Sequence, residues 1–239
     1  MNLLITRPIA ESNETAALIE AETSHKLFIS PLLETKFLIK TLALNGDENI
    51  IITSANGVDA LAKNHPSKNF KLNLIGDASY QKAQALGYIN VNIGEKSKLD
   101  SNPNNLINFI CNNYKVETIF HHITSISANR EIEKILTSNG YIYKRHELYK
   151  IKEKILPPDI IADISSGKIM GVMLFSSKTA EVMLKEFEKH NLLESLEEIK
   201  LFCFSKQISG VFNSYKNLEI YYPDKININS FIELLRHHG

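Results

Sequence analysis

The chain has 239 residues, of which 44% are apolar and 23% charged, a composition typical of a globular protein with a substantial core. Lysine plus arginine number 27 and aspartate plus glutamate number 27, so the balanced charge excludes a general attraction to nucleic acid or to anionic membranes. We therefore expect any anionic ligand to be held by local groups, in one large domain or two modest ones.

Short apolar runs rich in Ile, Leu and Val recur along the chain, each followed by a polar turn and an amphipathic segment. In chain order the predicted strands lie at 3–6, 27–30, 50–53, 72–75, 89–92, 117–121, 142–147, 171–175, 200–204 and 218–222. Helices are expected between them, for instance at 11–22 and 177–190. Strands of this kind that alternate with helices indicate parallel, doubly wound α/β sheets, and their number favours two sheets over one.

An internal similarity indicates two related lobes. Residues 50–63 and 172–185 both contain an apolar strand, two hydroxyl residues and then a helix, and residues 72–87 resemble 199–213 in the same way. A strand–turn–helix pattern that occurs twice in each half of the chain fits two lobes of similar architecture.

The lobe boundary is predicted from two extended segments. Residues 28–38 contain Pro31, and residues 145–158 end in Pro157-Pro158, a strong signal for a break in regular structure. We interpret these segments as a pair of linkers. One lobe would comprise 1–33 plus 150–239, and the second lobe, 34–149, would be inserted in it.

Uncharged polar residues follow the strand at 50–53. In open parallel sheets, ligands bind beyond the carboxyl ends of the strands, where helix N-termini present free N–H groups. The simpler interpretation is that Ser54 or Asn56 is a helix N-cap, which contributes ~1 kcal/mol to stability. Four strand ends share this hydroxyl-rich design and favour a common binding cleft; they lie at 53–56, 76–79, 176–179 and 205–209.

Several ligand classes lack their motifs. No GxGxxG follows a strand and no P-loop motif occurs, which argues against dinucleotide and nucleoside-triphosphate sites. A phospho-receiver would need an acidic pair at the end of the first strand, where Thr6 and Arg7 stand. His121-His122 and His237-His238 are adjacent pairs whose members point to opposite faces of a strand, so we expect surface or half-buried histidines rather than metal ligands.

The compartment is predicted from the cysteines and from the absence of a membrane signal. Cys111 and Cys203 stand far apart without metal-binding spacing, so we expect two free, buried thiols in a reducing compartment. The first apolar run has no basic region before it and stops at Thr6, which is not typical of a signal peptide. No apolar stretch approaches the ~18 residues of a membrane span. We therefore expect a cytoplasmic protein.

Six blocks of sequence, in this order, resemble the uroporphyrinogen-III synthase family. They are LLITRP (3–8), PLLE (31–34), IITSANGVDAL (51–61), LIGDASYQKAQALGY (74–88), ANREIEKILTSNGYIYKRHELYKI (128–151) and MLFSSKTAEVML (173–184). The resemblance implies two Rossmann-like or flavodoxin-like lobes joined by a two-stranded linker, with the active site in the cleft between them. It also implies a monomeric lyase of heme and porphyrin biosynthesis that uses neither a metal nor a cofactor.

The implied reaction closes hydroxymethylbilane, a linear tetrapyrrole with eight carboxylates, to uroporphyrinogen III with inversion of ring D. In the usual mechanism, loss of hydroxide leaves an azafulvene on ring A, which the substituted carbon of ring D attacks to give a spiro intermediate. A hydroxymethylbilane synthase is the expected partner that supplies this unstable substrate in a transient contact.

The resemblance also assigns site residues. Tyr149 stands at the family's linker tyrosine, which is expected to assist departure of hydroxide; the alternative is a hinge tyrosine that only packs. The remaining polar positions match the family's turns and are expected to bind substrate: Thr53, Ser54, Asn56 and Ser79 in the inserted lobe, and Ser176 and Ser177 in the other.

The distribution of cations adds an expectation of its own. Arg7, Lys178 and Lys206 follow strands of the split lobe, whereas the turns at 53–57 and 76–80 carry no cation. We expect Arg7 and Lys178 to bind substrate carboxylates while the inserted lobe supplies neutral donors; Lys206 is better interpreted as an ordinary surface lysine.

Two turns depart from the family pattern, at 122–130 and at 205–208. They support an alternative in which the chain is a non-catalytic, two-lobed tetrapyrrole-binding protein of the same fold. A nucleotide-binding or receiver domain is disfavoured by the missing glycine and acidic motifs.

Overall fold

The computed structural model describes residues 1–93 and 102–239, which form two compact units. Unit 1 comprises Met1–Glu34 and Lys152–Gly239, and unit 2 comprises Thr35–Ile151. The division into independently folding lobes, at 33/34 and 149/150, stays a prediction.

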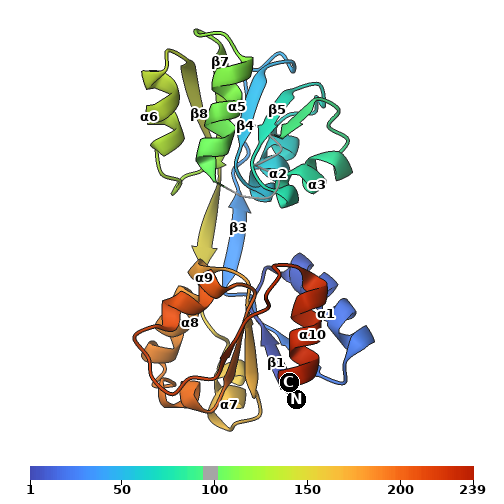
Figure 1. The fold of residues 1–239 in the computed structure, drawn as a ribbon, viewed down its shortest axis with the longest axis vertical. Coiled ribbons are helices and arrows are strands. Elements are labelled where there is room, and N and C mark those ends of the chain that lie inside the picture. The colour runs from blue at the N-terminus through green and yellow to red at the C-terminus, as the bar shows by residue number, and fades with distance from the viewer. Residues whose placement is uncertain (94–101) are drawn as a thin grey trace. The chain divides into compact units, whose positions relative to one another are not determined.

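Unit 1 contains a parallel sheet in the order β11-β10-β9-β1-β2, with helices on both faces (Figure 1). Its strands are β1 (Asn2–Ile5), β2 (Lys26–Ile29), β9 (Gly171–Leu174), β10 (Lys200–Cys203) and β11 (Ile220–Tyr221). Its helices are α1 (Ile9–Glu22), α7 (Pro158–Ser165), α8 (Ser177–Lys189), α9 (Lys206–Ser209) and α10 (Ile228–His238), with 3-10 turns at Glu194–Glu197 and Gly210–Phe212.

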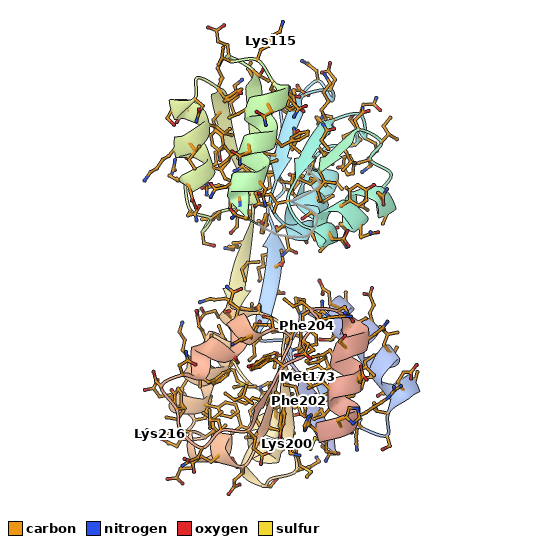
Figure 2. The ribbon with its side chains drawn as sticks, in the orientation of Figure 1. Lys115, Met173, Lys200, Phe202, Phe204 and Lys216 are labelled. Carbon is orange, nitrogen blue, oxygen red and sulfur yellow. The ribbon has the colours of Figure 1, made fainter. Side chains whose placement is uncertain are left out.

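Alternation of apolar side chains explains why this sheet is covered on both faces. Leu4 and Leu174 pack on the side of α7 and α8, whereas Ile5 and Phe202 pack on the side of α1 and α10. Met173 and Phe202, labelled in Figure 2, are fully buried. Successive residues of a strand point to opposite faces, so a continuous apolar run requires a helix layer on each side.

The second sheet has the strand order β3-β8-β7-β4-β5-β6. Its strands are β3 (Leu33–Phe37), β4 (Asn49–Ile52), β5 (Lys71–Leu74), β6 (Val91–Ile93), β7 (Ile119–Ser125) and β8 (Ile142–Glu153), of which β4 to β8 are parallel. The described helices are α2 (Ala55–Asn64) and α3 (Asp77–Ala85) on one face, and α5 (Pro103–Asn113) and α6 (Glu131–Ser138) on the other. The isoleucines of β4 again divide between the two faces, Ile50 and Ile52 toward α2 and Ile51 toward α5 and α6.

Strands β3 and β8 differ from the sequence prediction. The sequence predicts a strand at 142–147 and an extended linker at 145–158, and in the structure the two are one strand, β8, of 12 residues that ends at Glu153. It lies beside β3, with Leu38 N–H donating to Leu148 O (2.8 Å) and Lys154 N–H donating to Leu32 O (2.9 Å). The two bonds occur in opposite order along the segments, so β3 and β8 are antiparallel. Each segment supplies the hydrogen-bond partners that extend the other, which neither sequence pattern reveals alone.

Three side chains are buried differently from expectation. Cys203 is buried as predicted, but Cys111 is exposed on α5, so the prediction of two buried thiols is wrong for Cys111. His121 and His122 on β7 are 6% and 3% exposed, more deeply buried than the predicted surface or half-buried histidines. Side chains of the neighbouring strand β8 contact them, His146 on His121 and Tyr143 on His122.

Candidate active site

The turn between β4 and α2 lies at the edge where the parallel strands of unit 2 end, called here the carboxyl edge. Ser54 is the N-cap of α2, and its Oγ accepts a hydrogen bond from the Gly57 N–H at 3.3 Å. The same Oγ lies 2.8 Å from the hydroxyl of Tyr149. The N-cap interpretation of Ser54 is therefore correct, and the hydroxyl has a second partner as well.

Tyr149 reaches this turn from β8, although it lies 95 residues from Ser54 in the chain. It is only 6% exposed and packs with the core residues beneath α2. Burial raises the pKa of Tyr149 above its usual value, and the hydrogen bond with Ser54 opposes that rise only in part. The phenol is therefore protonated at neutral pH and is able to donate a hydrogen bond.

The end of β7 adds further hydroxyls beside Tyr149. Ser125 pairs in register with Tyr149, and the Ile126 N–H donates to the Tyr149 carbonyl oxygen at 3.0 Å. The hydroxyls of Ser125 and Ser127 lie 3.0 Å apart. Three neighbouring segments of the carboxyl edge thus bring Ser54, Tyr149 and a serine pair into one neighbourhood.

Arg145 on β8 donates hydrogen bonds to the turn after β7. Its guanidinium donates to the carbonyl oxygens of Ser125 (3.1 Å), Ala128 (2.9 Å) and Asn129 (3.3 Å). Its Nε also donates to Glu147 at 2.9 Å. This turn departs from the family pattern in sequence, and Arg145 supplies the donors that its carbonyl groups need.

The other predicted residues of unit 2 differ in how much of their surface is exposed. Thr53 and Asn56 are half-buried at the β4–α2 turn. Ser79 lies inside the first turn of α3 and is 2% exposed, so little of its surface is open to a ligand. Its role in binding stays a prediction.

The predicted residues of unit 1 gather at the carboxyl edge of the other sheet, since β1 and β9 are adjacent and parallel. Ser176 is the N-cap of α8, with its Oγ accepting from the Thr179 N–H at 3.1 Å, and Ser177 begins the helix. The Arg7 guanidinium lies 4.5 Å from the centroid of the Phe175 ring and donates to Thr15 Oγ1 at 3.0 Å. This places a half-buried cation on an aromatic surface.

Lys178 is less available to bind a substrate carboxylate than the sequence predicts, because it is already ion-paired. Its Nζ lies 2.7 Å from Glu153 and 3.6 Å from Glu181, and Lys185 lies 3.3 Å from the same Glu153 carboxylate. Substrate binding by Lys178 would have to compete with these exposed ion pairs.

The turn at 205–208 contains no side-chain cap within the described chain. Ser205 precedes the short helix α9, and Lys206 is exposed.

The described residues contain no group of three or more His, Cys, Asp or Glu side chains that could hold a metal ion. Among the same residues, every helix is too short or too polar to cross a lipid bilayer.

Comparison with models of known protein families shows to which family this chain belongs. The family described as uroporphyrinogen-III synthase HemD matches residues 13–233. The chain belongs to the uroporphyrinogen-III synthase family. It is therefore an enzyme of tetrapyrrole biosynthesis, as the resemblance implied.

Solved structures confirm the fold class. The uroporphyrinogen-III synthetase from Helicobacter pylori is 15% identical, with a TM-score of 0.65 and coverage of 100% of both chains. A mutant uroporphyrinogen III synthase from the extremely thermophilic bacterium Thermus thermophilus is 12% identical, with a TM-score of 0.59 and coverage of 99% of this chain and 98% of that one. No curated protein sequence matches the chain. The likeness is thus one of fold, an α/β architecture with parallel sheets.

Three residues near the synthase site were not predicted from the sequence. Arg145, Ser125 and Ser127 were not singled out, although they form or hold the turn that pairs with the backbone of Tyr149. Ser125 and Ser127 stand in a hydroxyl-rich run after a strand, the same signal that identified Ser54. Arg145 carries no comparable signal, because its partners are backbone carbonyl groups.

Gly57 is required by close packing in this synthase site. A Cβ atom there would lie 2.7 Å from Ile52 Cγ2 and 3.3 Å from the Ile123 carbonyl oxygen. We expect Gly57→Ala to lower the free energy of unfolding by about 1–3 kcal/mol in urea denaturation, because either the helix or β4 must shift.

Gly210→Ala is the matched control for this prediction. Among the described residues, the nearest neighbour of a Cβ at Gly210 would be Asn213 Nδ2 at 3.9 Å, and the backbone φ of −58° suits alanine. We expect this variant to be neutral or stabilised by up to ~1 kcal/mol. Equal stability of the two variants would contradict the packing argument.

Proposed function

We propose that this protein closes hydroxymethylbilane to uroporphyrinogen III with inversion of ring D. The family match over residues 13–233 carries the proposal. The buried hydroxyl pair of Ser54 and Tyr149, 2.8 Å apart at the carboxyl edge of unit 2, supports it. In the reaction the C–O bond of the hydroxymethyl group breaks, and the pyrrole nitrogen supplies the electron pair that leaves an azafulvene.

Tyr149 is the proposed donor to the departing hydroxyl. Its protonated phenol can hydrogen-bond to the leaving oxygen, while Ser54 holds the phenol oxygen in position. The substrate's own pyrrole nitrogens stabilise the cation, so the site needs no strong acid. The net change is loss of water with carbon–carbon bond formation, which transfers no electrons and calls for no redox cofactor.

Selectivity for the inverted isomer needs control of shape. Favouring the inverted path 100-fold requires ~2.7 kcal/mol of differential stabilisation. Each charge-assisted hydrogen bond to a carboxylate contributes roughly 1.5–3 kcal/mol, so a few oriented donors suffice. We propose these donors among the predicted binding residues: Arg7, Thr53, Ser54, Asn56, Ser79, Ser176, Ser177 and Lys178, the last after release from Glu153.

We further propose a cytoplasmic monomer that receives its substrate from hydroxymethylbilane synthase. The linear substrate closes spontaneously to the uninverted isomer, so a short path between the two enzymes would protect it. The balanced charge of 27 cationic and 27 anionic side chains supports a small-molecule partner over a nucleic acid or a membrane.

The test is a coupled assay in which hydroxymethylbilane is generated in place and the oxidised type I and type III isomers are separated. We expect predominantly type III product, in an amount that rises with the concentration of this protein. A reaction without the protein gives the rate of spontaneous closure to type I. Type I alone at that spontaneous rate would refute the proposal and favour the non-catalytic tetrapyrrole-binding alternative.

A further inference from the structure

A cavity of about 400 Å³ opens on unit 2, outside the hydroxyl pair of the candidate active site. Leu42 and Leu148 give it an apolar part, and its remaining lining is polar or charged: Lys40, Thr41, Arg130, Arg145, His146 and Glu147. This volume lies within the ~300–1,000 Å³ typical of small-molecule sites.

Cationic side chains outnumber carboxylates in the lining of this cavity, in a chain whose net charge is zero. Three cationic side chains line it against the single carboxylate of Glu147, which Arg145 already holds at 2.9 Å. Arg130 pairs with Glu133, and 62% of its side chain is exposed. Across residues 1–93 and 102–239, the Lys40 ammonium has no ion-pair partner. Lys40 is thus open to an anionic ligand, and the exposed Arg130 would share its charge between Glu133 and the ligand.

His146, which also lines the cavity, resists protonation chiefly because it is partly buried. Its pKa is lowered to about 4, first by burial and then by His121, Lys144 and Lys40. His146 is therefore neutral at pH 7 and adds no positive charge to the cavity.

The cavity adjoins the candidate active site through Arg145. This guanidinium lines the cavity and donates to the Ser125 carbonyl oxygen, while Ser125 pairs with Tyr149. A ligand group in the cavity would therefore sit beside the turn that hydrogen-bonds to the Tyr149 backbone. An apolar part with cations at its rim suits a carboxylate on a short aliphatic arm.

We propose that this cavity binds a carboxylate arm of the polyanionic substrate, with Lys40 and Arg130 as the charge donors and Arg145 as the residue that positions the turn. This inference rests on the proposed function. It revises the expectation that the inserted lobe supplies only neutral donors, because the cations come from segments other than the turns at 53–57 and 76–80.

The test compares two double variants that each remove two positive charges. Lys40→Gln with Arg130→Gln alters the cavity, and Lys115→Gln with Lys134→Gln removes two lysines of unit 2 outside it. The probe is uroporphyrin III, the stable oxidised form of the expected product, titrated by fluorescence at constant ionic strength. We expect the cavity variant to bind at least about tenfold more weakly and the control to bind like the unmodified protein.

Equal affinity of both double variants for uroporphyrin III would overturn the proposal. An NMR titration with glutarate, a dianion with a short aliphatic arm, supplies a second readout, with shifts expected at the amides of 40–42 and 145–148. Glutarate shifts without any loss of uroporphyrin affinity would indicate a separate small-anion site and would also overturn it. Weakened uroporphyrin binding in a protein that forms no type III isomer would refute the proposed function while supporting the cavity.

Discussion

Replacing Tyr149 by phenylalanine is expected to lower turnover to type III product about 100-fold, with little change in the Michaelis constant. The ring still fills the core beneath α2, so the fold is retained, but the donor beside Ser54 is lost. General acid or hydrogen-bond donation contributes typically ~10²–10⁴-fold, and a phenol with a raised pKa belongs at the lower end. The coupled isomer assay measures this change.

Tyr88→Phe is the matched control for the Tyr149 prediction. Tyr88 is 4% exposed and belongs to the same core cluster, but its buried hydroxyl has no hydrogen-bond partner within the described chain. Its removal should leave turnover unchanged. Unchanged turnover in Tyr149→Phe as well would mean that Tyr149 only packs, which was the alternative raised by the sequence.

Ser54→Ala separates positioning from capping. This change removes both the N-cap of α2, worth ~1 kcal/mol, and the 2.8 Å partner of Tyr149. In a double-mutant cycle on turnover, Ser54→Ala should have little further effect in the Tyr149→Phe background, because the two hydroxyls act as a unit. Additive losses would contradict a shared role.

The second large effect is a loss of stability in mild acid. We expect the free energy of unfolding to fall by roughly 2–4 kcal/mol between pH 7.5 and pH 5, because the buried His122 and the half-buried His146 resist protonation. The pKa of His122 is lowered to about 3 by burial and by Arg145 and His146, and its Nδ1 lies 2.5 Å from the Tyr143 hydroxyl. The pKa of His146 is lowered to about 4.

The direction of this effect follows from the difference in proton binding between the folded and the unfolded chain. Both histidines have an ordinary pKa of 6.5 in the unfolded chain. Below that pH the unfolded chain binds protons that the folded chain does not, so stability is complete above pH 6.5 and falls as the pH drops toward 4 and 3. The contribution of His122 at pH 5 is about 2 kcal/mol, and that of His146 is smaller because solvent screens a half-buried group.

Urea denaturation followed by circular dichroism at several pH values measures this loss. His122→Gln should flatten the pH dependence by about 2 kcal/mol between pH 7.5 and pH 5. His237→Gln, at an exposed position near the end of α10, should leave it unchanged. A His122→Gln protein with the full acid dependence would show that other groups cause the loss.

The local pattern of the chain determined most of the secondary structure. The apolar run predicted at 50–53 corresponds to β4 at Asn49–Ile52, and the helix predicted at 177–190 corresponds to α8 at Ser177–Lys189. Such elements are predictable because hydrophobic periodicity and N-caps are signals carried by neighbouring residues. The same local blocks, taken in order, were sufficient to indicate the family.

The site was predicted as separate residues. Ser54 and Tyr149 each had a reason to be chosen, but the 2.8 Å contact between their hydroxyls depends on β4 and β8 meeting at one carboxyl edge. Their separation of 95 residues leaves no local trace in the sequence. Parallel pairing of strands decides which turns become neighbours.

By itself, the sequence determined the α/β class, the order of strands and helices, and the candidate hydroxyl residues, because each depends on periodicity or turn chemistry within a few positions. The tertiary structure alone decided the deep burial of His121 and His122, the ion pair of Lys178 with Glu153, and the hydrogen bonds from Arg145 to three carbonyl groups. Each of these depends on a partner from a distant segment, and no single segment encodes its partner in its own pattern.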